Sequence, residues 1–140
     1  MLEVISFHGI GSSKDPLFVN KDRFEEVILG YHKQKYVQVE YDEIKKDSLS
    51  FQSKSVLFTF DDAYESVMEA YPILERYGYT GLLFISSAHI GKNNTYKTSN
   101  LSETSRLLSH EQIKFLIDKG WKVASHSHSH QILDSLDKIR

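Results

Sequence analysis

Cysteine is absent from the 140-residue chain. This excludes disulfide bonds, a thiolate metal site and a cysteine nucleophile, so any metal ion must be held by His, Asp or Glu. No apolar run approaches the ~20 residues that a membrane-spanning helix needs, and the first residues lack the basic segment of a signal peptide. Taken as it stands, the sequence predicts no membrane partner and a cytoplasmic location. A secreted protein that has lost its leader would share these features.

A strong charge of one sign is also missing. Seventeen Lys and Arg residues stand against nineteen Asp and Glu, for a net charge of −2. This balance gives no electrostatic reason to expect a nucleic-acid partner. The length, with 40% hydrophobic and 26% charged residues, suits one globular domain over residues 1–140 with a single hydrophobic core.

Strand patterns alternate with helix patterns along the chain. Apolar or alternating runs predict strands at 2–7, 36–41, 55–60, 80–86 and 121–125. Helical spacing predicts helices at 21–35, 64–78, 109–120 and 131–140, with a single turn at 42–46 and a long exposed loop at 91–105. The continuous apolar run at 55–60 is typical of a strand covered on both faces. The alternation predicts an α/β fold with a parallel sheet and right-handed crossovers.

Single residues mark the ends of these elements. Asn20 is a predicted N-cap, and Ser109 with Gln112 has the spacing of a capping box. Gly78 is a predicted C-cap. Pro72, one of only two prolines, is expected to bend or split its helix because it lacks an N–H donor.

Two polar motifs follow predicted strands. In "VLFTFDDAYES" the strand ends at Asp61 and Asp62, and in "WKVASHSHSH" a strand leads to His126 and His130. Parallel α/β folds gather their chemistry at the C-terminal ends of strands, so both motifs are expected at one rim. Adjacent carboxylates repel and need a cation, hydrogen-bond donors or water to compensate them.

The histidines supply a candidate for that cation. His126 and His130 are four positions apart, so both rings can face one point. Two His and one carboxylate form a common open site for zinc or a similar ion, and a second carboxylate beside it can act as a proton acceptor. Alone, each motif has a plainer interpretation: the Asp pair as a turn or helix cap, the histidines as a solvated turn.

Together the motifs resemble the polysaccharide deacetylases of carbohydrate esterase family 4, the NodB-homology domain. "TFDDAYES" is similar to that family's Thr-Phe-Asp-Asp-Gly motif, and "SHSHSHQIL" to its His-Ser/Thr-x-x-His motif. "YPILERYGYTGLLFIS", "LSHEQIKFLIDKGWKVASHSHSH" and "ISFHGIG" also resemble family segments. The resemblance implies a distorted (β/α) barrel and a metal-dependent hydrolase that removes N-acetyl groups from N-acetylhexosamine units of a polysaccharide or oligosaccharide.

The resemblance also implies roles for single residues. Asp61 matches the catalytic base, and Asp62, His126 and His130 match the metal ligands, with Zn expected and Co or Ni as alternatives. Ser127 matches a Ser/Thr position whose hydroxyl orients the ligands.

Two further residues are candidates for contact with a glycan substrate. Tyr64 directly follows the Asp pair and is expected to line a sugar-binding cleft. His8 follows the first strand and is expected at the same rim, as a pocket or structural residue. His128 occupies an unspecified position of the histidine motif and is expected in a pocket or on the surface.

The chain departs from the family pattern in two ways. Ala63 stands where the family has glycine, a change expected to be mild unless the position needs a positive φ. The later family motifs, an Arg-x-Pro-Tyr-like segment and a late His, are absent. We therefore expect an incomplete barrel, truncated at the C-terminus, whose open sheet edges are covered by a missing segment or a dimer partner.

Two other functions stay open from the sequence. One is a catalytically incomplete deacetylase-like fragment, or a domain that binds a glycan or metal without turnover. The other is a receiver domain, because a strand ending in Asp-Asp resembles its magnesium-binding corner. That second interpretation needs an Asp and a Lys at later strand ends, where this sequence has "FISS" and "SHSHSH".

Overall fold

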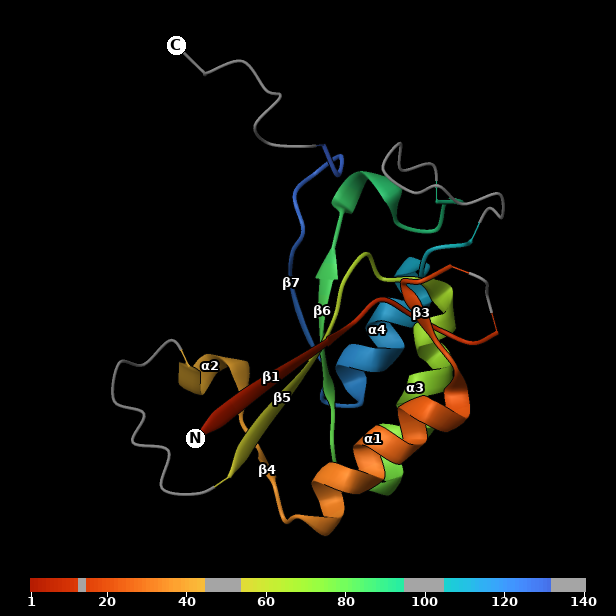
Figure 1. Ribbon diagram of the computed structural model, residues 1–140. Coiled ribbons are helices and arrows are strands. Elements are labelled where there is room, and N and C mark those ends of the chain that lie inside the picture. The colour runs from red at the N-terminus through yellow and green to blue at the C-terminus, as the bar shows by residue number, and fades with distance from the viewer. Residues whose placement is uncertain (13–14, 45–53, 95–104, 132–140) are drawn as a thin grey trace.

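The computed structural model describes residues 1–12, 15–44, 54–94 and 105–131, and its centre is a parallel β-sheet (Figure 1). Strand β5 (Ser55–Phe60) lies in the middle of this sheet. It pairs on one edge with β1 (Leu2–Phe7), and on the other with β4 (Val37–Gln38) and then β6 (Gly81–Ile85). Strand β7 (Lys122–Ser125) pairs with β6. Every pairing is parallel, which confirms the predicted sheet type.

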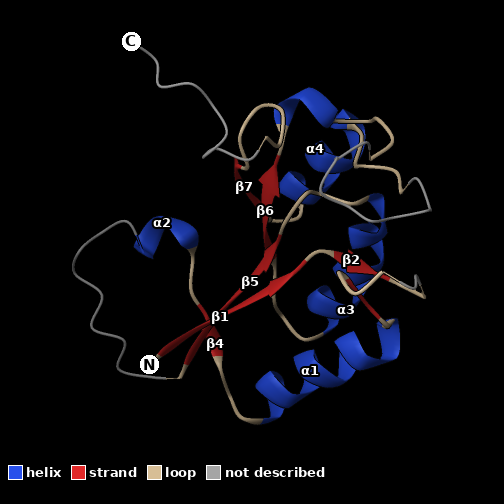
Figure 2. Ribbon diagram, turned by 45° about the horizontal axis from the view of Figure 1, so that its top comes forward, coloured by secondary structure: helices blue, strands red, loops and turns tan. Residues whose placement is uncertain are grey.

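Helices cover the two faces of the sheet unequally. The helices α1 (Lys21–Lys33), α3 (Ala70–Arg76) and α4 (His110–Asp118) lie together on one side of the strands, as Figures 1 and 2 show. The short α2 (Tyr41–Ile44) lies on the other side. In the described part of the chain, no helix combines the length and the apolar character that crossing a bilayer would require.

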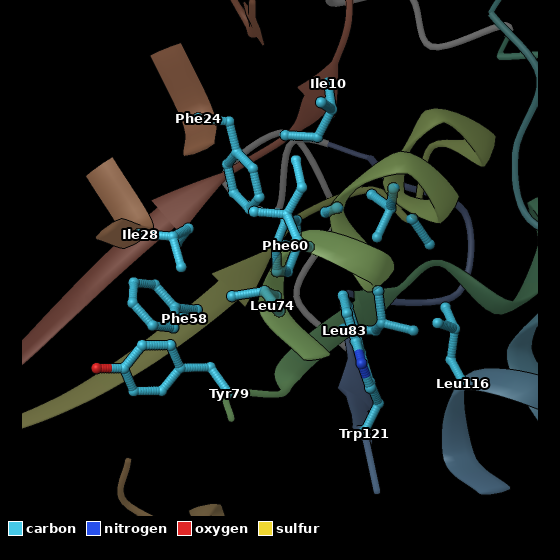
Figure 3. Packing of buried hydrophobic residues seen from close by; sticks show 14 of the residues in the cluster. Ile10, Phe24, Ile28, Phe58, Phe60, Leu74, Tyr79, Leu83, Leu116 and Trp121 are labelled. Atoms are coloured by element: carbon cyan, nitrogen blue, oxygen red, sulfur yellow. The ribbon is translucent and has the colours of Figure 1, made fainter. Parts of the chain in front are cut away.

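The main core lies between the sheet and the three larger helices. All six residues of β5 are buried, as its continuous apolar run predicted. Phe60 packs against Phe24 of α1 and against Trp121, which directly precedes β7, with ring centroids 6.1 and 5.2 Å apart (Figure 3). Trp121 also covers Gly81, where a Cβ atom would lie 2.4 Å from the indole ring.

The sequence signals at helix ends are confirmed. The Asn20 side chain accepts from the amides of Asp22 and Arg23, and Ser109 and Gln112 form the predicted capping box. The predicted break near Pro72 is present as well, because a 3-10 helix η1 (Glu65–Glu69) precedes α3. Pro72 is the third residue of α3, in the first turn, where a missing N–H costs no helical hydrogen bond.

Other predictions need correction. The strand predicted at 36–41 is reduced to β4, because the chain turns into α2 at Tyr41. The turn-rich segment after β1 contains an unpredicted parallel pair of β2 (Gly9–Ile10) and β3 (Phe18–Val19). The helix predicted at 131–140 and most of the loop predicted at 91–105 lie outside the described residues.

Candidate metal centre and active site

A tight turn after β5 places the two aspartates. Asp61 still follows the sheet, since its amide donates to the carbonyl of Phe7 on β1 at 2.8 Å. Asp62 and Ala63 then adopt left-handed backbone conformations, with φ values of 66° and 56°. Aspartate tolerates this region, whereas alanine pays for its Cβ. The substitution of the family's glycine by Ala63 is therefore not mild, which corrects the expectation from sequence.

A second strained turn follows β7 and places the histidines. Ser127 and His130 also have left-handed backbones, with φ values of 66° and 52°. The Ser127 hydroxyl accepts a hydrogen bond from the His130 amide at 3.0 Å, which closes the turn. Ser127 therefore orients the segment between the two histidines, consistent with the role expected for it.

The two turns bring three donor atoms to one point. Asp62 Oδ1 lies 3.3 Å from His126 Nε2 and 2.9 Å from His130 Nε2. All three atoms lie within 4.8 Å of one another. With Zn–N and Zn–O bonds of about 2.0–2.2 Å, a tetrahedral ion would hold its ligand atoms about 3.3–3.5 Å apart. The Asp62–His126 separation matches that spacing, and the Asp62–His130 separation is a few tenths of an ångström shorter.

The burial of Asp62 is consistent with a site for a cation. Its side chain is only 5% exposed, and within the described residues Oδ1 accepts no hydrogen bond despite the two nearby ring nitrogens. A buried carboxylate oxygen that accepts no hydrogen bond is rare, because its desolvation is not compensated. Donor atoms that approach one another without hydrogen-bond geometry fit a shared metal ion, and a carboxylate with two imidazoles suits zinc and related ions.

Asp61 lies beside this cluster and is partly open to solvent. Its side chain is 25% exposed, and Oδ2 lies 3.9 Å from His8 Nε2. Ser6 donates its hydroxyl to the same oxygen at 3.2 Å. The register of β1 and β5 causes this arrangement, because Ser6 pairs with Thr59 and the chain beyond places His8 beside Asp61. The structure thus brings His8 to the rim, as expected, and adds Ser6, a polar residue of β1 that the sequence analysis passed over.

Tyr64 does not lie in a cleft. It is 1% exposed and forms a small second cluster with Leu107 and Phe18. Its hydroxyl accepts a hydrogen bond from Asn94 Nδ2 at 2.8 Å. The turn at Asp62 and Ala63 directs the ring back into the protein, so the expectation of a sugar-contacting Tyr64 is corrected.

His128 points away from the donor cluster. Its exposed ring contacts the Ser87 hydroxyl through Nδ1 at 2.8 Å. This surface position agrees with its place between the two ligand candidates in the sequence. Ser87 begins η2 (Ser87–His89), the short 3-10 helix after β6, so the His128 ring contacts η2 and not the donor cluster.

Comparison with known proteins assigns the family. A family model described as polysaccharide deacetylase matches residues 48–140. The chain belongs to the polysaccharide deacetylase family. YxkH of Bacillus subtilis (strain 168) is 32% identical over 143 residues, which are 96% of this chain and 45% of YxkH. The poly-β-1,6-N-acetyl-D-glucosamine N-deacetylase of Staphylococcus aureus (strain MRSA252) is 30% identical over 126 residues, which are 87% of this chain and 41% of that protein.

A solved structure shows the same fold. The structure of IcaB from Ammonifex degensii matches with a TM-score of 0.75 and 26% sequence identity, over 89% of this chain and 52% of that one. The described strands and helices are therefore part of the distorted (β/α) barrel of the polysaccharide deacetylase family. The chain spans less than half the length of the two curated relatives.

Proposed function

We propose that this chain carries the metal and base residues of a carbohydrate N-deacetylase. The reaction is hydrolysis of the N-acetyl group of an N-acetylhexosamine unit in a polysaccharide or oligosaccharide. The observation that carries the proposal is the convergence of Asp62, His126 and His130 directly beside the partly exposed Asp61. The Staphylococcus aureus relative is named as an N-deacetylase of poly-β-1,6-N-acetyl-D-glucosamine, which supports the substrate class.

Asp62, His126 and His130 would hold a divalent cation. Their two nitrogens and one oxygen favour zinc, with cobalt or nickel as alternatives. When bound, such an ion lowers the pKa of a coordinated water and polarises a carbonyl oxygen.

Asp61 is the proposed general base. It is adjacent to Asp62 in the chain but aims its carboxylate to the more open side of the turn, where Ser6 and His8 contact Oδ2. The Ser6 hydrogen bond fixes the orientation of the carboxylate. Asp61 can then accept a proton from the water that attacks the acetyl carbonyl. Return of that proton to the amide nitrogen lets the carbon–nitrogen bond break, which releases acetate and the free amino sugar.

Metal content and acetate release test this proposal together. We expect about one zinc or similar ion per chain, lost in the variant His126→Ala/His130→Ala and kept in His110→Ala, which removes an exposed histidine of α4. On N-acetylglucosamine oligomers, Asp61→Asn should reduce acetate release by about 10²-fold or more and keep the metal. Turnover unaffected by Asp61→Asn would contradict the assignment of the base.

The same experiment separates a second function. A chain that binds metal through these residues but releases no acetate would be a metal-binding or glycan-binding domain without turnover. One observation favours this second function. Among the described residues the Asp61 side chain contacts a hydroxyl and an imidazole but no arginine, and the family's Arg-x-Pro-Tyr-like segment is absent from the sequence.

We further propose that the outer edges of β1 and β7 are covered by a second copy of the chain or by additional strands. Within the described residues each of these strands pairs with one neighbour, and Val4 and Val123 are 56% and 41% exposed. Unpaired edges bearing apolar side chains favour association. Sedimentation of the purified chain should show a dimer, whereas a monomer would leave additional strands as the remaining alternative.

A further inference from the structure

The segment that follows β6 holds the segment that carries the two histidine ligands. We call residues 126–130 the ligand loop. Residues 86–89 contact four successive carbonyl groups of this loop. Two of the contacts come from side chains: Ser86 Oγ lies 2.7 Å from the carbonyl oxygen of His126, and His89 Nε2 lies 3.3 Å from the carbonyl oxygen of Ser129. The other two come from main-chain amides: the Ser87 amide donates to the carbonyl of Ser127 at 3.4 Å, and the Ala88 amide donates to the carbonyl of His128 at 2.9 Å.

These contacts begin where the regular sheet ends. The amide of His126 donates to the carbonyl of Ile85 at 2.9 Å, which continues the β6–β7 ladder by one bond. Beyond Ile85 the chain bends into η2. At the next residue the donor is a side chain and not a main-chain amide: the Ser86 hydroxyl donates to the carbonyl of the same His126. His126 is therefore held on both sides of its Cα atom.

The hydrogen bond between the Ser127 hydroxyl and the His130 amide is a contact that the ligand loop makes within itself, and the loop also depends on contacts from outside. Ser127 and His130 both have left-handed backbones, which L-residues adopt only when surrounding contacts impose them. The hydroxyl of Ser86 is well placed to impose this conformation, because it binds the peptide group that joins His126 to Ser127. Ser86 itself is 2% exposed, so water does not compete for its hydrogen bond.

We propose that Ser86 is a positioning residue for the metal centre: its buried hydroxyl fixes the conformation of the ligand loop and thereby sets the metal affinity. This inference rests on the proposed function, since it assigns the metal to Asp62, His126 and His130. In the described structure the Ser86 hydroxyl bonds the main chain of His126 and none of the three ligand side chains. It acts through the carbonyl of His126, as hydrogen-bond partners behind metal ligands do.

The first measurement is the affinity of the chain for Zn²⁺ and Co²⁺, with the Co²⁺ absorption spectrum as a report on ligand geometry. Ser86→Ala should weaken affinity about 10- to 100-fold and change the Co²⁺ spectrum. Ser55→Ala is the matched control, because Ser55 is also buried but lies at the opposite end of the sheet. It should leave affinity within about twofold of the parent chain, since Ser55 begins β5 and the ligand Asp62 follows the other end of that strand.

The second measurement is amide hydrogen exchange of His126 and His130 without metal. Ser86→Ala should speed exchange at both amides, whereas Ser55→Ala should not. Unchanged exchange in Ser86→Ala, equal effects of the two variants, or unprotected amides in the parent chain would each overturn the proposal. A parent chain that binds no metal, with faster loop exchange in Ser86→Ala, would instead overturn the proposed function and support the positioning of the loop.

Discussion

Backbone strain at the level of single residues is concentrated in the candidate site. Among the described residues other than glycine, positive φ values occur at Asp62, Ala63, Ser127 and His130, and elsewhere at Lys35. The first four form the two turns that carry the ligand atoms. Such conformations are unfavourable and persist where surrounding contacts determine them, which is common at functional sites. Two strained turns that meet at one donor cluster are thus a second sign of function beside the residue types.

Ala63 offers a test of this strain. Ala63→Gly and Ala70→Gly both remove a buried methyl group and free the unfolded backbone, which together cost about 1–2 kcal/mol. Only Ala63→Gly also relieves a left-handed alanine, worth about 1–2 kcal/mol. We expect Ala63→Gly to unfold in urea with nearly the free energy of the parent chain, and Ala70→Gly to be about 1–2 kcal/mol less stable. Equal losses in the two variants would show that Ala63 is not strained.

Glu3 gives a prediction for pH. It accepts hydrogen bonds from the hydroxyls of Tyr36 and Tyr31, and these bonds, that from Tyr36 most, hold the pKa of Glu3 below its ordinary value of 4.5. Burial and the same hydrogen bond raise the pKa of Tyr31 to about 12 from 10.0. The lowered carboxyl pKa contributes stability that is present above pH 4.5 and is lost as pH falls through the lower folded value. The raised tyrosine pKa contributes stability that is present below pH 10 and is lost towards pH 12.

Glu3→Gln should therefore be less stable than the parent chain in the range between these limits, and the difference should shrink in acid. Urea unfolding at a series of pH values measures this difference. Tyr31→Phe removes one of the two hydroxyls that donate to Glu3. The free energy of unfolding should then fall less steeply in acid but still fall, because Tyr36 still donates. A difference between the parent and Glu3→Gln that does not change with pH would contradict the role of this cluster.

At the scale of elements, the sequence predicts best where one physical cause acts alone. The continuous apolar run of β5 needs two covered faces, the Asn20 side chain is a local cap, and Pro72 restricts where α3 can begin. Each of these three signals is a single residue or a short run of residues that can be recognised in the sequence. The pair of β2 and β3 was not predicted, because it depends on a contact between two residues nine positions apart, the packing of the Phe18 ring on Gly9.

The site shows the same division. Asp62, His126 and His130 could be placed at one rim because each follows a strand of a parallel sheet, and the structure brings their donor atoms together. Tyr64 was misplaced because the sequence does not reveal that Asp62 and Ala63 turn the chain inward. Ser86 was passed over because a serine at a strand end is common, and only the partner strand shows that its hydroxyl meets a ligand residue.

Packing between β6 and β7 gives an element-scale prediction. A Cβ atom on Gly81 of β6 would lie 2.4 Å from the ring of Trp121, whereas one on Gly30 of α1 would meet nothing within 4 Å. Gly81→Ala should therefore destabilise the protein by about 1–3 kcal/mol through overpacking. Gly30→Ala should stabilise it by about 0.5–1 kcal/mol through helix propensity. Thermal unfolding of both variants checks the opposite signs, and a tolerated Gly81→Ala would mean that Trp121 can move away.

At the scale of the whole molecule, the metal centre joins parts of the chain that are far apart in sequence. Asp62 follows β5 in the middle of the sheet, and His126 and His130 follow β7 at its end, with β6 between them. A bound ion would therefore link the outer strand to the central one at the same rim. Because the unfolded chain cannot hold the three donors in this arrangement, metal binding should favour the folded state.

Metal removal tests this link. At a free Zn²⁺ concentration of 100 times Kd, binding should stabilise the parent chain by about 2.7 kcal/mol, seen as a higher unfolding temperature that EDTA reverses. Asp62→Asn should abolish this response. Without metal, however, the variant should be at least as stable as the parent, because Asp62 is a buried carboxylate whose Oδ1 accepts no hydrogen bond in the described structure. A large loss of stability in metal-free Asp62→Asn would show instead that the carboxylate stabilises the fold through its contacts with the two histidines.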